Sequence, residues 1–414
     1  MQNWGNSILH FSFNILNYTT MQRLKILYLS VEDPEDKKSW SGIHFNILSQ
    51  LRKYYDVSVA GPLSTTRLTP IRTKVLYYYS KFFLRKRYDA LHSGIIAQDH
   101  ALQIQNKINA GHQLVFSTAS SGELAELQTD IPIVHLSDAT FELVHNYYEG
   151  FSNLSRFSSR HAEAIEQRAI NKAALRIYSS DWAAASAINH YHADPSLTFV
   201  VPFGANIDAI PEIDVEVKQW NKVFNLLFLG VNWKRKGGDI VYATFLELKR
   251  RGIECHLTIC GCTPPNPLND PAVTVIPFLN KNNKEDLAAF TKLLHDSHVL
   301  FLPTRADCTP IVFCEAAAYG LPVITTDTGG VSSIVRHEET GYCLAYNAGV
   351  NEYADVIALL ANDRLKYAGM ALKSRQHFLQ NLNWDSWGKQ VKKIIDKHIL
   401  KRTEDTPYSI ARSR

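Results

Sequence analysis

The feature that most constrains the fold of this chain is an alternation of short apolar runs with longer helical patterns, which occurs twice. The first series begins with LKILYLS at residues 24–30, and the second begins with NLLFLG at residues 225–230. Strands as continuously apolar as these are typical of parallel sheets that helices cover on both faces. The sequence therefore predicts an α/β protein with two doubly wound, Rossmann-like domains that face each other across a cleft. Ligands of such sheets bind beyond the carboxyl ends of the strands, so functional residues are expected there.

Further apolar runs fill out both series. Helical patterns separate them, among others at 155–174, 284–296 and 311–319, and Asp181 is expected to cap the helix that follows it. The other strand candidates are DVSVA, QLVFST, PIVHLS, LRIYSS and LTFVVPFG in the first half, and CHLTIC, AVTVIPF, HVLFLP and LPVITTD in the second.

With 414 residues, the chain is long enough for two domains of ordinary size. We expect the first domain at 21–208 and the second at 223–382. Pro211 and scattered charges mark a linker between them, at 209–222. Outside the domains we expect an N-terminal extension at 1–20, a C-terminal helix at 383–401 and a charged tail at 402–414.

Composition excludes several classes of protein. Lys and Arg exceed Asp and Glu by 44 − 40 = 4, a balance too small for a general nucleic-acid binder. The six cysteines form no C-x-x-C pair and no His cluster accompanies them, so neither a zinc site nor a disulfide framework is indicated. A reducing cytoplasm fits this pattern. No apolar run approaches the ~20 residues of a membrane-spanning helix, and residues 1–20 lack the pattern of a signal peptide.

A basic turn follows the first strand of the second series, in FLGVNWKRKGG. Lys234, Arg235 and Lys236 lie between that strand and the next helix. Three crowded cations repel one another unless an anion neutralises them, and a diphosphate suits the planar fork of Arg and the point charge of Lys. The alternative is a solvated basic turn. Its place after a core strand favours a functional role.

A second turn of this kind is DCTPIVFCEAAAYG, which carries two acids. Pro310 and the alanines that follow predict a helix that begins near 310, where free N–H groups and the helix dipole suit a phosphate. A carboxylate at Glu315, one turn inside, could accept both hydroxyls of a ribose. The alternative is that Asp307 and Glu315 only favour the helix start. That accounts for Asp307 better than for Glu315, whose neighbours are apolar.

Three weaker signals lie at other strand ends. The glycine pair in TDTGGV could approach a ligand closely or form an ordinary tight turn. Gly42, in SWSGIHF, lies on the first strand–helix turn and suits close approach of a phosphate, although G-x-G-x-x-G is absent and a nicotinamide or flavin site is poorly supported. Asp138 follows a strand at the expected cleft, and it could also simply cap a helix.

The segment LYYYSKFFLRKRY, at residues 76–88, mixes aromatic residues with Lys81, Arg85, Lys86 and Arg87. A basic, aromatic helix can lie on an anionic membrane surface. The alternative, which we favour, is a buried helix with a basic end.

With these residues assembled, the chain resembles the retaining glycosyltransferases of family 4 (glycosyl transferases group 1), which have the GT-B fold, over about residues 24–400. The E-x7-E signature of the family corresponds to Asp307 and Glu315, followed by AAAYGLPVITTDTGG, and its basic turn corresponds to Arg235 and Lys236. VVPFGANID resembles the segment that closes the first domain of the family, and SDWAAASAI and SDATF are similar to segments of bacterial members.

The resemblance implies a nucleotide-sugar donor held mainly by the second domain. Glu315 would hold the ribose hydroxyls, and Arg235 with Lys236 would hold the diphosphate. The acceptor would bind mostly to the first domain, to which the last helix, with Trp384 and Trp387, would cross back. The remaining residues expected around the donor are Gly42, Thr309 and the backbone N–H groups of Ile311, Val312 and Phe313.

The chain departs from the family pattern in two places. Asp307, which is expected to contact the donor sugar, is one methylene shorter than the usual Glu. The family often has a His where this chain reads SDATF. Asp138 is the expected substitute, with Ser137 and His135 as alternatives.

The expected reaction is transfer of a sugar, with retention, from a nucleotide-diphosphate sugar to a glycan, polysaccharide or lipid-linked acceptor. Arg235, Lys236 and the helix start near 310 would stabilise the leaving diphosphate, so no metal or other cofactor is expected, and Asp138 and Asp307 complete the expected catalytic set. The alternatives are a non-catalytic nucleotide-sugar binding protein and another GT-B activity, such as a phosphorylase or a sugar-nucleotide epimerase. We expect a cytoplasmic protein without a nucleic-acid partner, and peripheral membrane contact through 76–88 stays open.

Overall fold

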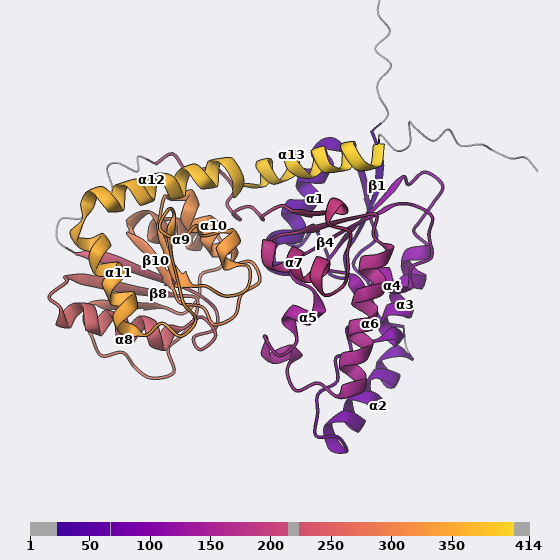
Figure 1. Ribbon diagram of the computed structural model, residues 1–414, viewed down its shortest axis with the longest axis horizontal. Helices are drawn as coiled ribbons and strands as arrows, with labels where there is room; N and C mark the ends of the chain where they lie inside the picture. The colour runs from indigo at the N-terminus through magenta and orange to yellow at the C-terminus, as the bar shows by residue number, and fades with distance from the viewer. Residues whose placement is uncertain (1–22, 67, 214–222, 401–414) are drawn as a thin grey trace, which may run out of the picture.

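The computed structural model describes residues 23–66, 68–213 and 223–400. The extension expected at 1–20, most of the linker expected at 209–222 and the tail expected at 402–414 lie outside the described residues. Figure 1 shows two domains side by side, the first in indigo to magenta and the second in orange, with a long helical segment that runs along one edge of both.

The first domain is built on a six-stranded sheet in which every pair of neighbours is parallel, in the order β2-β1-β3-β4-β5-β6. Its strands are β1 (Lys25–Leu29), β2 (Asp56–Val59), β3 (Leu114–Thr118), β4 (Ile133–Ser137), β5 (Leu175–Tyr178) and β6 (Thr198–Val200). Its helices are α1 (Ile43–Tyr54), α2 (Thr69–Phe82), α3 (Gly94–Gln105), α4 (Ser121–Glu126), α5 (Phe141–Val144), α6 (Arg156–Lys172) and α7 (Asp181–Asn189).

The second domain repeats the design with the order β12-β11-β10-β7-β8-β9, again with parallel neighbours throughout. Its strands are β7 (Phe224–Leu229), β8 (Cys255–Cys260), β9 (Val273–Ile276), β10 (Val299–Leu302), β11 (Val323–Thr326) and β12 (Gly341–Leu344). Its helices are α8 (Gly238–Arg250), α9 (Lys284–Asp296), α10 (Ile311–Ala318), α11 (Val350–Asn362) and α12 (Arg364–Asn381), and α13 (Trp384–Ile395) follows.

The two parallel sheets confirm the predicted fold of two doubly wound domains. The central strands are apolar because both of their faces are covered: every residue of β3, β4, β5 and β10 is buried. Strand β12 was not predicted, since its sequence GYCL is short and begins with a glycine, which gives no apolar run to recognise.

The chain passes between the domains twice, and the two passages touch. The amide of Ala205 donates to the carbonyl of Leu382 at 2.9 Å, and a Cβ at Gly204 would overlap the backbone of Trp384. Helix α13 then lies along the first domain (Figure 1). Its Trp387 is fully buried there, with its ring centroid 6.4 Å from that of Phe116. Removing a buried ring of this kind typically costs about 3–5 kcal/mol, so α13 is part of the core of the first domain.

Two local predictions are wrong. Ser180, not Asp181, caps α7: its Oγ accepts from the amide of Ala183 at 3.2 Å, and Asp181 instead meets Ser333 of the second domain, whose Oγ donates to its carboxylate at 3.0 Å. A buried helix was also favoured for 76–88, but α2 ends at Phe82 and its aromatic side chains lie on the surface, with Phe82 67% exposed.

Candidate functional site

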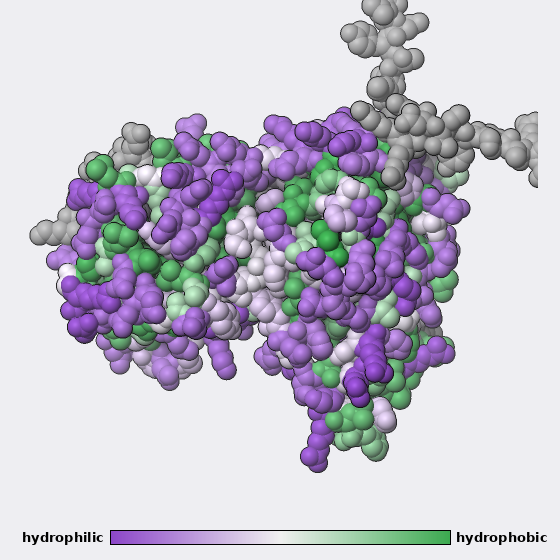
Figure 2. Space-filling view, in the orientation of Figure 1, coloured by the Kyte–Doolittle hydropathy of each residue, from purple (hydrophilic) through white to green (hydrophobic). Residues whose placement is uncertain are grey.

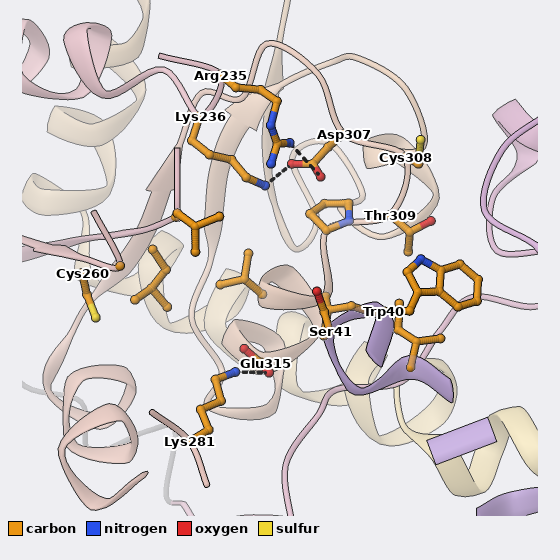
Figure 3. Close-up of a pocket in the computed structure, with 18 of the residues that line it drawn as sticks. Trp40, Ser41, Arg235, Lys236, Cys260, Lys281, Asp307, Cys308, Thr309 and Glu315 are labelled. Atoms are coloured by element: carbon orange, nitrogen blue, oxygen red, sulfur yellow. Dashed lines mark hydrogen bonds and ion pairs between the residues drawn. The ribbon is translucent and has the colours of Figure 1, made fainter. Parts of the chain in front are cut away.

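The candidate site lies between the two domains, beyond the carboxyl ends of the strands. In each sheet the strand order reverses once near its middle, between β1 and β3 in the first domain and between β7 and β10 in the second. Ligands of doubly wound sheets bind at such reversal points. A pocket of about 370 Å³ opens there, and residues of both domains line it (Figure 3). Its polar and charged lining includes Ser41, Asp138, Tyr148, Arg235, Lys236, Lys281, Asp307, Thr309 and Glu315.

The basic turn after β7 is held in place by the turn after β10. The Arg235 amide donates to Oδ1 of Asn232 at 2.9 Å, and its guanidinium donates to the carbonyl of Ala306 at 2.7 Å. Gly237 has a φ of 78°, and a Cβ there would overlap the carbonyl of Pro303. A glycine is therefore required for the two turns to pack together. The contact fixes the direction in which Arg235 and Lys236 enter the pocket.

Asp307 balances two of the three cations of this turn, Arg235 and Lys236. Lys236 Nζ bonds Asp307 Oδ2, and Arg235 Nη1 lies 3.7 Å from Asp307 Oδ1 (Figure 3). The hydroxyl of Thr304 donates to Asp307 Oδ2 at 3.1 Å. Burial lowers the pKa of Lys236, and the charge of Asp307 opposes that effect. One carboxylate thus neutralises only part of the charge of Arg235 and Lys236, so these two cations can also bind a further anion.

Glu315 is paired with a residue that the sequence analysis did not single out. Glu315 is 2% exposed, and Lys281 Nζ lies 2.6 Å from its Oε1 (Figure 3). Burial raises the pKa of Glu315, and Lys281 acts in the opposite direction. Lys281 also lies 4.1 Å from the centroid of the Phe290 ring. It follows β9 at the same edge of the sheet as the other cations, so its position at a strand end could have identified it.

Two of the three residues predicted at the start of α10 line the pocket, and the third does not. Ile311 and Val312 line the pocket, and within the described residues no acceptor bonds their amides. Phe313 differs, because its amide donates to the carbonyl of Pro310 at 2.9 Å and its ring is buried in the core of the second domain. The expectation that the N–H group of Phe313 is free for a phosphate is therefore wrong. Thr309 lines the pocket and bonds the hydroxyl of Ser179 in the first domain.

The first domain contributes the loop after β1. Trp40, Ser41 and Gly42 all have left-handed backbone, with φ of 44°, 57° and 86°. Such a run is costly for residues with a Cβ, and it is found where the surrounding structure imposes it. Here Nδ2 of Asn206 donates to the carbonyl of Ser41 at 2.5 Å. Trp40 and Ser41 line the pocket, whereas Gly42 lies outside the lining.

Of the three residues considered at the end of β4, Asp138 lines the pocket. His135 is fully buried within the sheet, and the Oγ of Ser137 donates to the carbonyl of Ala139 at 2.7 Å. Burial raises the pKa of Asp138 to about 6, and the nearby charge of Asp307 adds to the rise. The two carboxylates therefore share one cavity.

Two tyrosines of the segment after α5 join the domains beside the pocket. The hydroxyl of Tyr147 accepts from the amide of Asp307, and that of Tyr148 accepts from the amide of Cys308, both at 2.9 Å. The Tyr148 ring lies 5.6 Å from the guanidinium carbon of Arg235. Sequence reasoning missed both tyrosines, because they follow a short helix rather than a strand and no motif marks them.

The glycine pair after β11 packs against protein rather than against the pocket. A Cβ at Gly329, whose φ is 58°, would overlap the carbonyl of Asp307, and one at Gly330 would overlap that of Cys308. The pair therefore supports the turn that carries Asp307.

Some features of the described residues concern other classes of site. Among them, no group of three or more His, Cys, Asp or Glu side chains is placed to hold a metal ion. Within the same ranges, each helix is either too short or too polar to cross a membrane. The six cysteines are all free.

Comparison with known proteins agrees with this geometry. Residues 223–363 match the family described as glycosyl transferases group 1. The chain is 23% identical over 285 residues to the D-inositol 3-phosphate glycosyltransferase of Corynebacterium aurimucosum, which aligns 64% of this chain with 66% of that relative. It is 25% identical over 334 residues to the protein of the same name from Pseudarthrobacter chlorophenolicus, covering 75% of this chain and 77% of the relative.

Two solved structures share the fold. Sucrose-phosphate synthase from Thermosynechococcus elongatus superposes with a TM-score of 0.60 at 16% identity, covering 92% of this chain and all of that one. Alr3699/HepE from Anabaena, solved in complex with UDP and glucose, has a TM-score of 0.60 at 14% identity, covering 91% of this chain and all of that one. The chain thus has the GT-B fold.

Proposed function

We propose that the protein is a glycosyltransferase that moves a sugar from a nucleoside-diphosphate donor to an acceptor, with retention of configuration, as in glycosyltransferase family 4. The family match over residues 223–363 and the names of the relatives support glycosyl transfer as the class of reaction. The complexes of Alr3699/HepE with UDP and with UDP-glucose support a nucleotide-sugar donor.

One observation carries the proposal: two cations, the start of a helix and a buried carboxylate line a single pocket. Arg235 and Lys236 share Asp307, so a diphosphate that enters beside them meets cations that are only partly neutralised. Helix α10 begins at the same pocket. The free amides of Ile311 and Val312 and the positive end of the helix dipole therefore lie beside the expected diphosphate. Glu315 lies at the other end of the pocket, where its carboxylate can accept the hydroxyls of a ribose.

These residues suit a reaction in which a diphosphate leaves an anomeric carbon. As the carbon–oxygen bond breaks, its electron pair passes to the diphosphate, and negative charge grows beside Arg235, Lys236 and α10. Donors already aimed at that charge lower the barrier without reorganising. In the proposal these cations serve where other enzymes use a divalent metal. The acceptor oxygen then attacks from the face that the diphosphate leaves, and its proton passes to an oxygen of the departing diphosphate. Asp138 and Asp307 lie in the same cavity.

The first domain supplies the acceptor side in this proposal. Trp40, Ser41 and Tyr148 face the pocket from that domain and offer two aromatic rings and a hydroxyl. Such a surface suits the apolar faces and hydroxyl groups of a sugar. We therefore propose a glycan, polysaccharide or lipid-linked acceptor and, since all six cysteines are free, a cytoplasmic location.

The proposal is tested by release of nucleoside diphosphate across a panel of nucleotide sugars, with and without candidate acceptors, inorganic phosphate and a metal chelator. We expect release from one donor to increase with an acceptor, to resist the chelator and to give a product with the donor's anomeric configuration by NMR. Binding of a donor without turnover would point to a binding protein. A requirement for inorganic phosphate would indicate a phosphorylase, and isomerisation without an acceptor would indicate an epimerase.

A further inference from the structure

Helix α2 and its flanks hold a dense group of exposed large hydrophobic residues. Figure 2 shows apolar residues gathered at the lower tip of the first domain, over the position of α2 in Figure 1. Of the 22 large hydrophobic residues that are exposed in the described residues, nine fall within residues 68–84. They are Leu68, Ile71, Val75, Tyr77, Tyr78, Tyr79, Phe82, Phe83 and Leu84. A cluster of this density on the surface marks an interaction site rather than chance exposure.

Helix α2 buries its polar face against the domain and exposes its apolar face, the reverse of an ordinary surface helix. Its buried positions are small and polar, namely Thr69, Thr73 and Ser80, and Thr73 bonds the carbonyl of Thr69 at 3.0 Å. Its outer face carries side chains at helical spacing, which we call the α2 stripe: Ile71, Val75, Tyr78 and Phe82. The helix therefore turns its apolar side to solvent, so the domain core does not account for the stripe.

Cations flank the stripe. Arg72, Lys74 and Lys81 are exposed on the same helix, and Arg85, Lys86 and Arg87 are exposed on the loop that follows it. Between Asp56 and Asp89 the sequence contains seven Lys or Arg residues and no acid. An apolar stripe bordered by cations is the arrangement of a helix that lies in the interface of an anionic membrane.

The charges also distinguish a membrane from other occupants. A second copy of this chain would bring two basic helices together, which costs free energy. Residues 1–22 contain no acid, and residues 401–414 carry four cations against two acids, so neither offers a counter-charge. We infer that the α2 stripe and its cations dock this protein on the surface of an anionic lipid bilayer. The inference does not depend on the proposed sugar transfer.

The docking surface is linked to the pocket by a short piece of chain. The Arg87 amide donates to the carbonyl of Asn153 at 2.8 Å, and its carbonyl accepts from the amide of Ser155 at the same distance. Asn153 and Ser155 belong to the segment 148–155, and its first residue, Tyr148, lines the pocket. A bilayer at the α2 stripe would therefore touch a loop that is bonded to a pocket-lining segment.

The test is flotation of the full chain with vesicles of phosphatidylcholine, alone or mixed with phosphatidylglycerol, at low and high salt. We expect flotation with the anionic vesicles only and its loss at high salt. The triple variant Arg72→Gln/Lys74→Gln/Lys81→Gln should lower the partition coefficient on the order of 100-fold. Val75→Ser/Tyr78→Ser/Phe82→Ser should lower it at least as much, because these side chains would enter the interface.

The matched control is Leu365→Ser/Lys366→Gln, which removes an exposed apolar residue and a cation from the second domain. It should float like the unaltered protein, and all variants should keep its circular dichroism spectrum and melting midpoint. Equal binding to neutral vesicles, no binding to either kind, or triple variants that still float would overturn the inference. So would a dimer in sedimentation without lipid that the stripe variants abolish, since a second copy would then be the occupant.

Discussion

The two faces of the interdomain cleft are built differently. On the second domain, charged side chains follow strands and pair with one another, as Lys236 does with Asp307 and Lys281 with Glu315. On the first domain, the face consists of aromatic rings on irregular loops and of Asp138, whose pKa burial raises to about 6. The difference teaches that the second domain fixes the charge of the site and the first domain shapes it. Substitutions on the second-domain face should therefore change kcat or the KM for the donor. Substitutions on the first-domain face should change the stability of the protein and the shape of the cleft.

The largest expected effect tests the charged face. Lys236→Ala removes the buried cation beside the proposed diphosphate, and we expect kcat to fall about 10²- to 10³-fold, the scale for losing one preorganised donor. The measurement is diphosphate release at saturating donor. Lys234→Ala is the control, because Lys234 belongs to the same turn but is exposed and does not line the pocket. Near-normal turnover in the Lys236 variant would contradict the proposed role of this face.

The same contrast explains which parts of the site could be predicted from sequence. Arg235, Lys236 and Asp307 were found because each follows an apolar strand, and the carboxyl ends of parallel strands meet at one edge of a sheet. Glu315 was found because it is an acid among apolar residues in the first turns of a predicted helix. The fold was predictable from the strands as well, since covered strands are continuously apolar. Residues that directly follow a buried strand can thus be predicted from the sequence.

Other parts of the site depend on tertiary contacts that leave no such signal. Trp40 faces the pocket because its loop is held in left-handed backbone by Asn206, more than 160 residues away in the chain. Tyr148 reaches across the cleft to the amide of Cys308. Lys281 follows a strand and could have been singled out, but its pairing with Glu315 of α10 depends on the order of the strands in the sheet. The exposure of α2 was missed because its composition resembles that of a core helix.

The second prediction asks whether Glu315 must be ionised. Loss of Lys281 in Lys281→Met should raise the pKa of Glu315 further, because burial then acts unopposed. A protonated carboxyl is a poorer acceptor for ribose hydroxyls, so we expect the donor KM to rise about 10-fold at neutral pH, the scale of one hydrogen bond to a charged group. The rise should shrink as pH increases through the raised pKa, with kcat little changed.

Steady-state kinetics over a pH series measure this effect, and Lys284→Met, an exposed cation in the same region, is the control. An increase in KM that stays constant with pH would show that Lys281 contacts the donor itself. A lower KM would show that Lys281 competes with the donor for Glu315.

The third prediction concerns the acid of the first face. Because the pKa of Asp138 rises to about 6 on folding from an ordinary value near 3.8, its ionisation destabilises the folded state. Below pH 3.8 Asp138 is protonated in both the folded and the unfolded state and costs no stability. The free energy of unfolding falls as pH rises from 3.8 towards 6, and above 6 Asp138 causes no further change. Asp138→Asn removes this loss, and we expect the melting midpoint to rise by about 4 °C at pH 7.5, and by progressively less towards pH 4.

Thermal unfolding followed by circular dichroism measures the difference, and Asp130→Asn, an exposed acid of the same domain, should not change the midpoint at any pH. A rise of equal size at all pH values would mean that the variant acts through packing. A fall at pH 7.5 would mean that ionised Asp138 stabilises the cleft, and the contrast between the two faces would then fail.

The smallest expected effect tests the contact that joins the two faces. Tyr148→Phe keeps the ring beside Arg235 but removes the hydroxyl that accepts from the Cys308 amide. One lost hydrogen bond of this kind costs about 1 kcal/mol, which corresponds to a fall of roughly 2 °C in the melting midpoint. Tyr346→Phe is the control, since Tyr346 is half-exposed on the second domain and stacks with Arg305 through its ring. Hydrogen exchange locates the loss: the Cys308 amide should exchange faster in the Tyr148 variant only. Unchanged exchange there would show that the domains are held together by the rest of the interface, such as the bond between Ser179 and Thr309.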